Sequence, residues 1–122
     1  MSHARQRLGE RGETLACEEL QRRGYAVLAR RYRTRFGEID IIASDAGAIV
    51  FVEVKARMSG TFGDPAEAVT SQKQRRLTAM AEDYLSRHHL TERPCRFDVV
   101  AVEADSPSPA ITLYKDAFRP GW

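Results

Sequence analysis

The chain has 122 residues, the length of one domain, and its 43% hydrophobic content is enough to build a single layered core. No apolar run approaches the roughly 20 residues that cross a bilayer, and the N-terminus lacks the apolar stretch of a secretory signal, so we expect a cytoplasmic protein without a membrane partner. The net charge is only +2, and the two cysteines lack zinc-site spacing, which argues against a thiolate metal site.

The first predicted element is a helix over residues 7–23. Apolar residues recur in it at helical spacing, and Gly24 supplies a C-terminal stop. Glu13 lies close to the apolar face, so its carboxylate is expected to point inward. The apolar positions of this helix are Leu8, Leu15, Ala16 and Leu20.

A strand is predicted next, over residues 25–33, and the chain up to this point is strongly basic. Residues 1–35 hold nine arginines against four glutamates, which suggests a polyanionic partner. A solvated helix face and edge strand explain the same charges equally well. The arginines closest together in sequence are Arg30, Arg31, Arg33 and Arg35.

Two apolar runs of strand length, 37–43 and 49–56, are separated by turn-forming residues and predict a hairpin. Residues 57–70 mix glycine, proline and polar side chains, and we expect a mobile loop there. A second helix begins at Ser71, followed by a strand over 96–102 and a short one over 111–114. This order predicts one α/β domain spanning residues 1–122, with an αβββαβ core, a mixed central sheet flanked by helices, and an extra C-terminal strand.

The hairpin brings charged side chains together. Glu53 and Lys55 are two apart on a strand and project from the same side. A turn centred on residues 46–47 sets Asp40 opposite Glu53 and Glu38 opposite Lys55. On this register Ile42 and Phe51 lie beneath the charged groups, while Ile39, Ile41, Val52 and Val54 pack on the opposite face.

An acid and a lysine at this spacing usually form a solvated pair, but here they interrupt the apolar run FVEVK. Two carboxylates a few ångströms apart repel each other unless they share a cation or a proton. Oxygen ligands of this kind select Mg²⁺ or Mn²⁺, and Asp40 and Glu53 are the predicted ligands. Lys55 beside them can stabilise phosphate charge or orient the attacking water, and Lys73 adds a cation in the first turn of the second helix.

The blocks GEID and FVEVKAR, separated by about a dozen residues, resemble the PD-(D/E)XK nuclease superfamily with its restriction-endonuclease-like core. Together with RRGY, FGDPAEAV, QKQRRL and RFDVVAV they resemble the YraN family of largely uncharacterised bacterial proteins, over nearly the whole chain. The resemblance implies metal-binding roles for Asp40 and Glu53, a catalytic role for Lys55, and the first-helix acidic role of resolvase-like members for Glu13. Ile39 replaces the proline of the formal motif, and Arg31 stands where the family commonly has asparagine.

The implied activity is that of a Mg²⁺- or Mn²⁺-dependent endodeoxyribonuclease acting on branched or otherwise structured DNA. One site cuts one strand, so a homodimer would serve to cut two. A non-catalytic DNA-binding or recombination and repair accessory module is the main alternative, and a protein-interaction domain with a structural acidic pocket is a third. The residues predicted to contact nucleic acid are Arg30, Arg31, Arg33, Arg35, Arg57, Gln72, Lys73 and Arg76.

Overall fold

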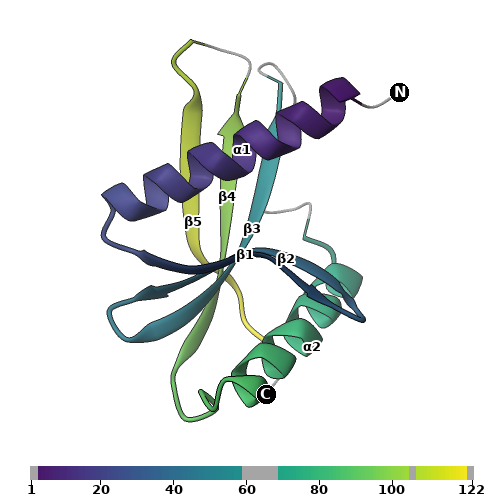
Figure 1. The fold of residues 1–122 in the computed structure, drawn as a ribbon, viewed down its shortest axis with the longest axis vertical. Helices are drawn as coiled ribbons and strands as arrows, with labels where there is room; N and C mark the ends of the chain where they lie inside the picture. The colour runs from purple at the N-terminus through teal and green to yellow at the C-terminus, as the bar shows by residue number, and fades with distance from the viewer. Residues whose placement is uncertain (1–2, 59–68, 105–106, 121–122) are drawn as a thin grey trace.

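A computed structural model describes residues 3–58, 69–104 and 107–120. The elements follow the predicted order, αβββαβ with one more strand (Figure 1). The predicted loop 57–70 lies outside the described residues except at its two ends. The bounds are α1 His3–Arg22, β1 Ala26–Thr34, β2 Gly37–Asp45, β3 Ala48–Arg57, α2 Ser71–Arg87, β4 Cys95–Glu103 and β5 Ala110–Phe118.

The five strands form one mixed sheet in the order β1-β2-β3-β4-β5. The pairs β1–β2, β2–β3 and β4–β5 are antiparallel, and β3–β4 is parallel, because the chain crosses from β3 to β4 through α2. The last strand is longer than the four residues predicted for it. The α/β class and the mixed sheet flanked by helices are therefore confirmed.

The sheet separates two apolar cores. One lies beneath α2 and contains Phe51, Phe97 and Tyr84, and the other lies beneath α1 and contains Leu20, Val52 and Val100. In Figure 1, α1 crosses β3, β4 and β5, and α2 lies below the β1–β2 hairpin. No described helix is long and apolar enough to cross a bilayer.

The β2–β3 hairpin has the predicted two-residue turn. Ala46 and Gly47 both have positive φ, 51° and 90°, as the tight turns that match the twist of antiparallel strands require. The register runs from Asp45 opposite Ala48 to Ile41 opposite Val52. This is the predicted register from the turn as far as Ile41 and Val52. The predicted strand pairing of Asp40 with Glu53 lies beyond the paired residues.

Close contact between α1 and β3 depends on Gly12. A Cβ built at Gly12 would lie 2.5 Å from the Cβ of Ala56, whereas a Cβ at Gly9 would meet nothing within 4 Å. We therefore expect Gly9→Ala to raise the free energy of unfolding by about 0.5–1 kcal/mol, through helix propensity alone.

Gly12→Ala has the same gain in helix propensity, but the added methyl group must push the helix away from the strand. We therefore expect the free energy of unfolding to fall by about 1–2 kcal/mol. Urea unfolding of the two variants beside the wild type checks the pair. Equal stabilisation by both substitutions would contradict the close contact.

Candidate functional site

Asp40 lies where β2 separates from β3. The paired part of the hairpin ends at Ile41 and Val52. One residue beyond this end, the Asp40 carboxylate accepts a hydrogen bond from the backbone N–H of Val54, at 2.8 Å. A side chain has thus taken the place of a backbone partner, and this contact fixes the carboxylate between the two strands.

The side-chain alternation of β2 breaks at the same place. Ile39 and Ile42 both face the α2 core, whereas Ile41 faces the α1 core. The prediction that Ile39 packs with Ile41 is therefore wrong. The register places Arg31 of β1 opposite Asp40, and Arg31 has a φ of 52°, so the regular pleat is interrupted in both strands at once.

Asp40 and Glu53 are two acids in contact at this site. Glu53 is only 8% exposed, although it is ionisable. Burial, the charge of Glu53 and a hydrogen bond with Glu53 raise the pKa of Asp40 from 3.8 to about 8, against the opposing effect of the Val54 N–H. Such a pair shares a proton when no cation is present, so the metal-free site holds Asp40 largely protonated at neutral pH.

This raised pKa predicts how stability depends on pH in the absence of metal. Because the folded-state pKa of Asp40 lies above its unfolded value, its contribution is fully present below pH 3.8 and is lost as the pH rises through about 8. A tenfold difference in proton affinity between the folded and unfolded states corresponds to about 1.4 kcal/mol. In EDTA, Asp40→Asn should therefore flatten the fall in unfolding free energy between pH 5 and pH 8, as measured by urea unfolding; an unchanged slope would contradict this assignment.

Lys73, rather than Lys55, is the cation beside these acids. The Lys73 ammonium forms an ion pair with Glu53 Oε2. Its position is fixed by the start of α2, where the Thr70 hydroxyl accepts the Lys73 backbone N–H at 3.2 Å. The Lys55 side chain is exposed on the strand that carries Glu53.

Glu13 of α1 approaches the same site from the other side of the sheet. Its negative charge is among the causes that raise the pKa of Asp40. The Glu13 carboxylate accepts a hydrogen bond from Arg31 Nε at 2.8 Å, and only 16% of its side chain is exposed. The prediction that Glu13 is directed inward agrees with this arrangement. Arg31, whose side chain is 45% exposed, is bound to Glu13 at the surface.

A pocket of about 240 Å³ opens beside Glu53 and Lys73. Glu38 also lines it, but the predicted pairing of Glu38 with Lys55 is wrong, because the paired hairpin ends before these residues. Glu38 instead lies 3.3 Å from Arg33. The remaining lining residues are Phe36, Gly37, Arg76, Leu77 and Met80.

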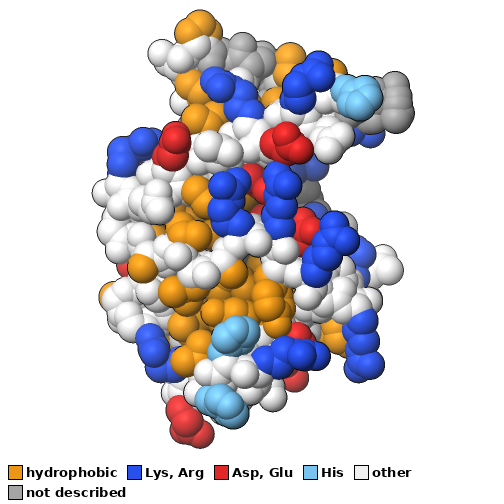
Figure 2. All heavy atoms as spheres, in the orientation of Figure 1, with side chains coloured by type: hydrophobic (Ala, Val, Ile, Leu, Met, Phe, Trp, Pro, Cys, Tyr) orange, Lys and Arg blue, Asp and Glu red, His pale blue; other side chains and the backbone are white. Residues whose placement is uncertain are grey.

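The predicted nucleic-acid contacts do not form one patch. Arg30 and Arg31 face α1: the charge of Arg30 opposes the rise in the pKa of Cys17, and Arg31 forms an ion pair with Glu13. Arg33 and Arg35 lie near the β1–β2 turn instead. Figure 2 shows Lys and Arg side chains gathered on the face where α1 crosses the sheet and along the adjoining edge. Three of the other predicted contacts are on α2: Gln72 is exposed, and Lys73 and the exposed Arg76 line the Glu53 pocket. Arg57 is half-buried at the end of β3.

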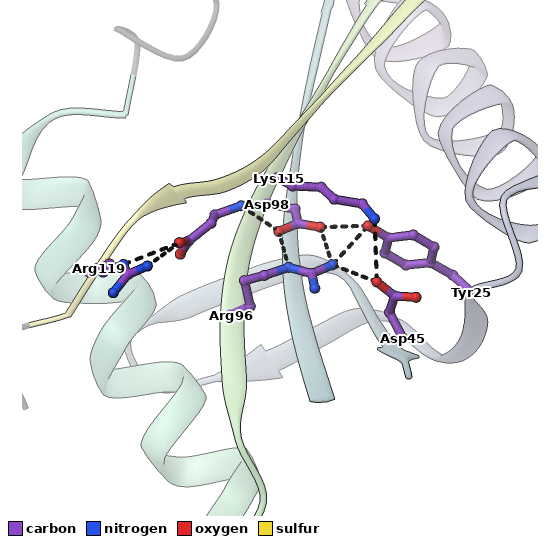
Figure 3. Close-up of polar contacts among 7 residues, drawn as sticks. Tyr25, Asp45, Arg96, Asp98, Lys115 and Arg119 are labelled. Carbon is purple, nitrogen blue, oxygen red and sulfur yellow. Dashed lines mark hydrogen bonds and ion pairs between the residues drawn. The ribbon is translucent and has the colours of Figure 1, made fainter. Parts of the chain in front are cut away.

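A second charged cluster was missed from the sequence. Buried Asp98 of β4 accepts hydrogen bonds from Tyr25 at 2.9 Å and from Arg96 Nε at 2.8 Å, and Arg96 also contacts Asp45 (Figure 3). Asp98 and Arg96 interrupt an apolar strand, and this interruption is the feature of the sequence that could have indicated the cluster. The backbone N–H of Asp116 donates to Asp98 as well, so the cluster joins three strands and the connection between α1 and β1.

The donor set suits a hard divalent cation. Among residues 3–58, 69–104 and 107–120, no three His, Cys, Asp or Glu side chains are arranged to hold a metal ion. Asp40 and Glu53 are a pair, and Mg²⁺ is commonly held by one or two carboxylates while it keeps several waters. Burial and the nearby charge of Glu53 raise the pKa of Asp40, and the Lys73 ammonium pairs with Glu53. A divalent cation would neutralise the same negative charge.

Comparison with known proteins places the chain in a family. Residues 12–102 match the profile of "Uncharacterised protein family UPF0102". A UPF0102 protein of Symbiobacterium thermophilum is 55% identical over 97 residues, covering 80% of this chain and 82% of the relative. Relatives from Nitrosococcus oceani and Dehalococcoides mccartyi are 45% and 41% identical, covering 91% and 97% of this chain and 90% and 98% of their own. The chain therefore belongs to the UPF0102 family, the YraN family that its sequence blocks resemble.

Proposed function

We propose that this protein is a divalent-metal-dependent endonuclease that hydrolyses phosphodiester bonds in DNA, with branched or otherwise structured DNA as its substrate class. The observation that carries the proposal is the contact between Asp40 and Glu53 in a buried position; burial and this contact together raise the pKa of Asp40 to about 8. Two carboxylates this close repel each other when both are charged, and a divalent cation would relieve that repulsion. Glu53 lines a pocket that also contains the basic side chains of Lys73 and Arg76.

Asp40 and Glu53 would hold Mg²⁺ or Mn²⁺. When bound, such an ion polarises a phosphate oxygen and lowers the pKa of a bound water. The Val54 N–H keeps the Asp40 carboxylate fixed between the strands, and Glu13 adds negative charge from α1. The acids are therefore oriented before a ligand arrives, and little ordering remains to be done.

The two lysines have separate roles in this proposal. Lys73 neutralises Glu53 in the metal-free protein and, once released, contacts the phosphate from the first turn of α2, where free N–H groups also favour an anion. Lys55, exposed on the same strand as Glu53, orients the water or stabilises charge on the phosphate. Arg76 lines the same pocket and adds positive charge.

The proposal is tested by incubating the protein with branched, duplex and single-stranded DNA in Mg²⁺, in Mn²⁺ and in EDTA. We expect metal-dependent cleavage of branched DNA, and its loss in Asp40→Asn. Size-exclusion chromatography on the substrate complex tells whether two copies act together to cut two strands. Absence of cleavage on all substrates in either metal, by a folded protein, would overturn the proposal.

A second candidate is a non-catalytic DNA-binding or recombination and repair accessory module. The ion pair between Lys73 and Glu53 favours it, because this pair already compensates part of the acidic charge without a metal. Binding would then depend on phosphate contacts, fall steeply with salt and survive Asp40→Ala. DNA binding without cleavage is the result that selects this candidate.

A further inference from the structure

A second pocket lies between the β1–β2 turn and α2. It has a volume of about 540 Å³ and is lined by residues 32–36 together with Asp83 and Arg87 of α2. We call it the hairpin pocket. Its lining combines three arginines with two aromatic rings and a single acid, a composition that fits an anionic ligand carrying a flat apolar part.

Phe36 is the apolar part of this lining. Its side chain is 40% exposed, which is unusual for a large aromatic residue. The Arg35 guanidinium lies over the Phe36 ring, 5.0 Å from the ring centroid. An exposed ring beside a guanidinium group is the combination on which nucleobases stack while their phosphates are bound.

The turn holds Phe36 in a fixed position. The backbone N–H of Phe36 donates to the Thr34 hydroxyl at 3.0 Å, and that hydroxyl donates to the Gly37 carbonyl at 3.2 Å. Gly37 has a φ of 132°, which a residue with a side chain rarely adopts. The backbone of this two-residue turn is therefore ordered, and a ligand that binds at Phe36 costs little further backbone entropy.

The charges of the hairpin pocket favour an anion. Asp83 is already compensated, because it accepts hydrogen bonds from Tyr32 at 3.2 Å and from Arg87 at 3.0 Å. Arg33 reaches Glu38 at 3.3 Å with 87% of its side chain exposed, and an ion pair of this kind is weak in water. Arg35 is exposed in the same turn. Both guanidinium groups can therefore reach a phosphate.

The hairpin pocket adjoins the proposed metal site. Phe36 lines both it and the smaller pocket that contains Glu53, Lys73 and Arg76. Asp40 follows Phe36 by four residues on the same hairpin. A DNA strand with its phosphodiester bond at the acids can therefore place a neighbouring nucleotide at Phe36.

We propose that the hairpin pocket binds an unpaired nucleobase of the strand being cut, stacked on Phe36, while Arg33 and Arg35 contact the flanking phosphates. This inference rests on the proposed nuclease function and makes its substrate class more specific. The substrate is DNA in which a base next to the scissile bond is free to leave the helix, as at a branch, a flap or a single strand. A continuous duplex keeps its bases stacked and cannot fill the pocket.

Binding in EDTA separates this inference from catalysis. Fluorescence anisotropy compares a single-stranded oligonucleotide with one of equal length and charge that carries abasic sites. Phe36→Ala should weaken binding to the normal strand by roughly five- to a hundredfold, the range of one stacked base, and leave binding to the abasic strand unchanged. Leu28→Ala removes another exposed apolar side chain, 46% exposed and outside both pockets, and should change neither.

Arg35→Gln provides the complementary test. It removes a phosphate contact, so it should weaken binding to both strands and reduce the slope of affinity against salt by about 0.7. Equal binding of the normal strand by Phe36→Ala and the wild type, or an equal loss on both strands in a variant that remains folded by circular dichroism, would overturn the stacking. Metal-dependent cleavage alongside that result would leave the nuclease proposal standing, whereas no DNA binding by the wild type would remove both.

Discussion

Glu53→Gln is expected to lower metal-dependent DNA cleavage by at least about 10³-fold, because a neutral amide neither balances a divalent cation nor raises the pKa of Asp40. Glutamine has nearly the same shape as glutamate, so the fold should persist. Single-turnover cleavage of branched DNA in Mn²⁺ measures the loss. Glu82→Gln is the matched control, since Glu82 is exposed on α2 and does not line the Glu53 pocket.

The same variant has a second expected effect. With Glu53 neutral, the pKa of Asp40 should fall toward its usual range, because the charge of Glu53 is one cause of its elevation. The dependence of unfolding free energy on pH in EDTA would then become shallower than in the wild type. Full cleavage activity in Glu53→Gln, with the fold verified, would contradict the assigned role of this residue.

Lys73→Met and Lys55→Met are expected to have opposite signatures. The Lys73 ammonium occupies the Glu53 carboxylate, so its removal should raise affinity for Mn²⁺ about tenfold, the equivalent of roughly 1.4 kcal/mol of lost competition. Lys55 is exposed, so Lys55→Met should leave Mn²⁺ affinity nearly unchanged and lower the cleavage rate about 10²-fold or more. Calorimetric titration with Mn²⁺ and single-turnover kinetics measure the two quantities separately.

The Lys73 variant also shows whether the Lys73 ammonium competes with the metal for Glu53 or only stabilises the fold. If Lys73 serves only to satisfy a buried acid, Lys73→Met should lose folding stability and gain no affinity for Mn²⁺. Methionine retains the packing of the aliphatic stem, which limits other causes of instability. Weaker Mn²⁺ binding by Lys73→Met would contradict the competition described above.

Local chemistry was sufficient to predict the order of the elements. The turn at Ala46 and Gly47 fixed the hairpin register, because a two-residue turn leaves one pairing of the strands that follow it. The apolar runs located β3. The capping-box-like pattern that begins at Ser71 located the start of α2 to within one residue, since the structure has its N-cap at Thr70. These features depend on neighbours in sequence, and so they could be predicted from it.

The details of the site depend on contacts between distant residues. The positive φ of Arg31 in β1 and the orientation of Ile39 toward the α2 core in β2 occur where the two strands meet, and neither leaves a mark in the apolar pattern. The pairing of Lys73 with Glu53 requires the position of α2 relative to β3, which hydrophobic spacing does not give. The four arginines near residue 30 separate onto different sides for the same reason.

The two charged pairs in buried strands show why spacing alone could not identify the site. Glu53 and Lys55 are two apart in β3, and Arg96 and Asp98 are two apart in β4. The second pair closes on itself through Tyr25 and is explained by hydrogen bonds within the fold. Glu53 instead opens into a pocket and lies against another acid, and this difference is visible only in three dimensions.

The most direct test of the account is a crystal structure of the protein soaked in Mn²⁺, at a pH above the Asp40 pKa of about 8. Anomalous scattering should locate an ion bound by Asp40 and Glu53, with the Lys73 ammonium moved away from Glu53. A crystal that takes up no manganese between these two carboxylates, with Lys73 still on Glu53, would contradict it.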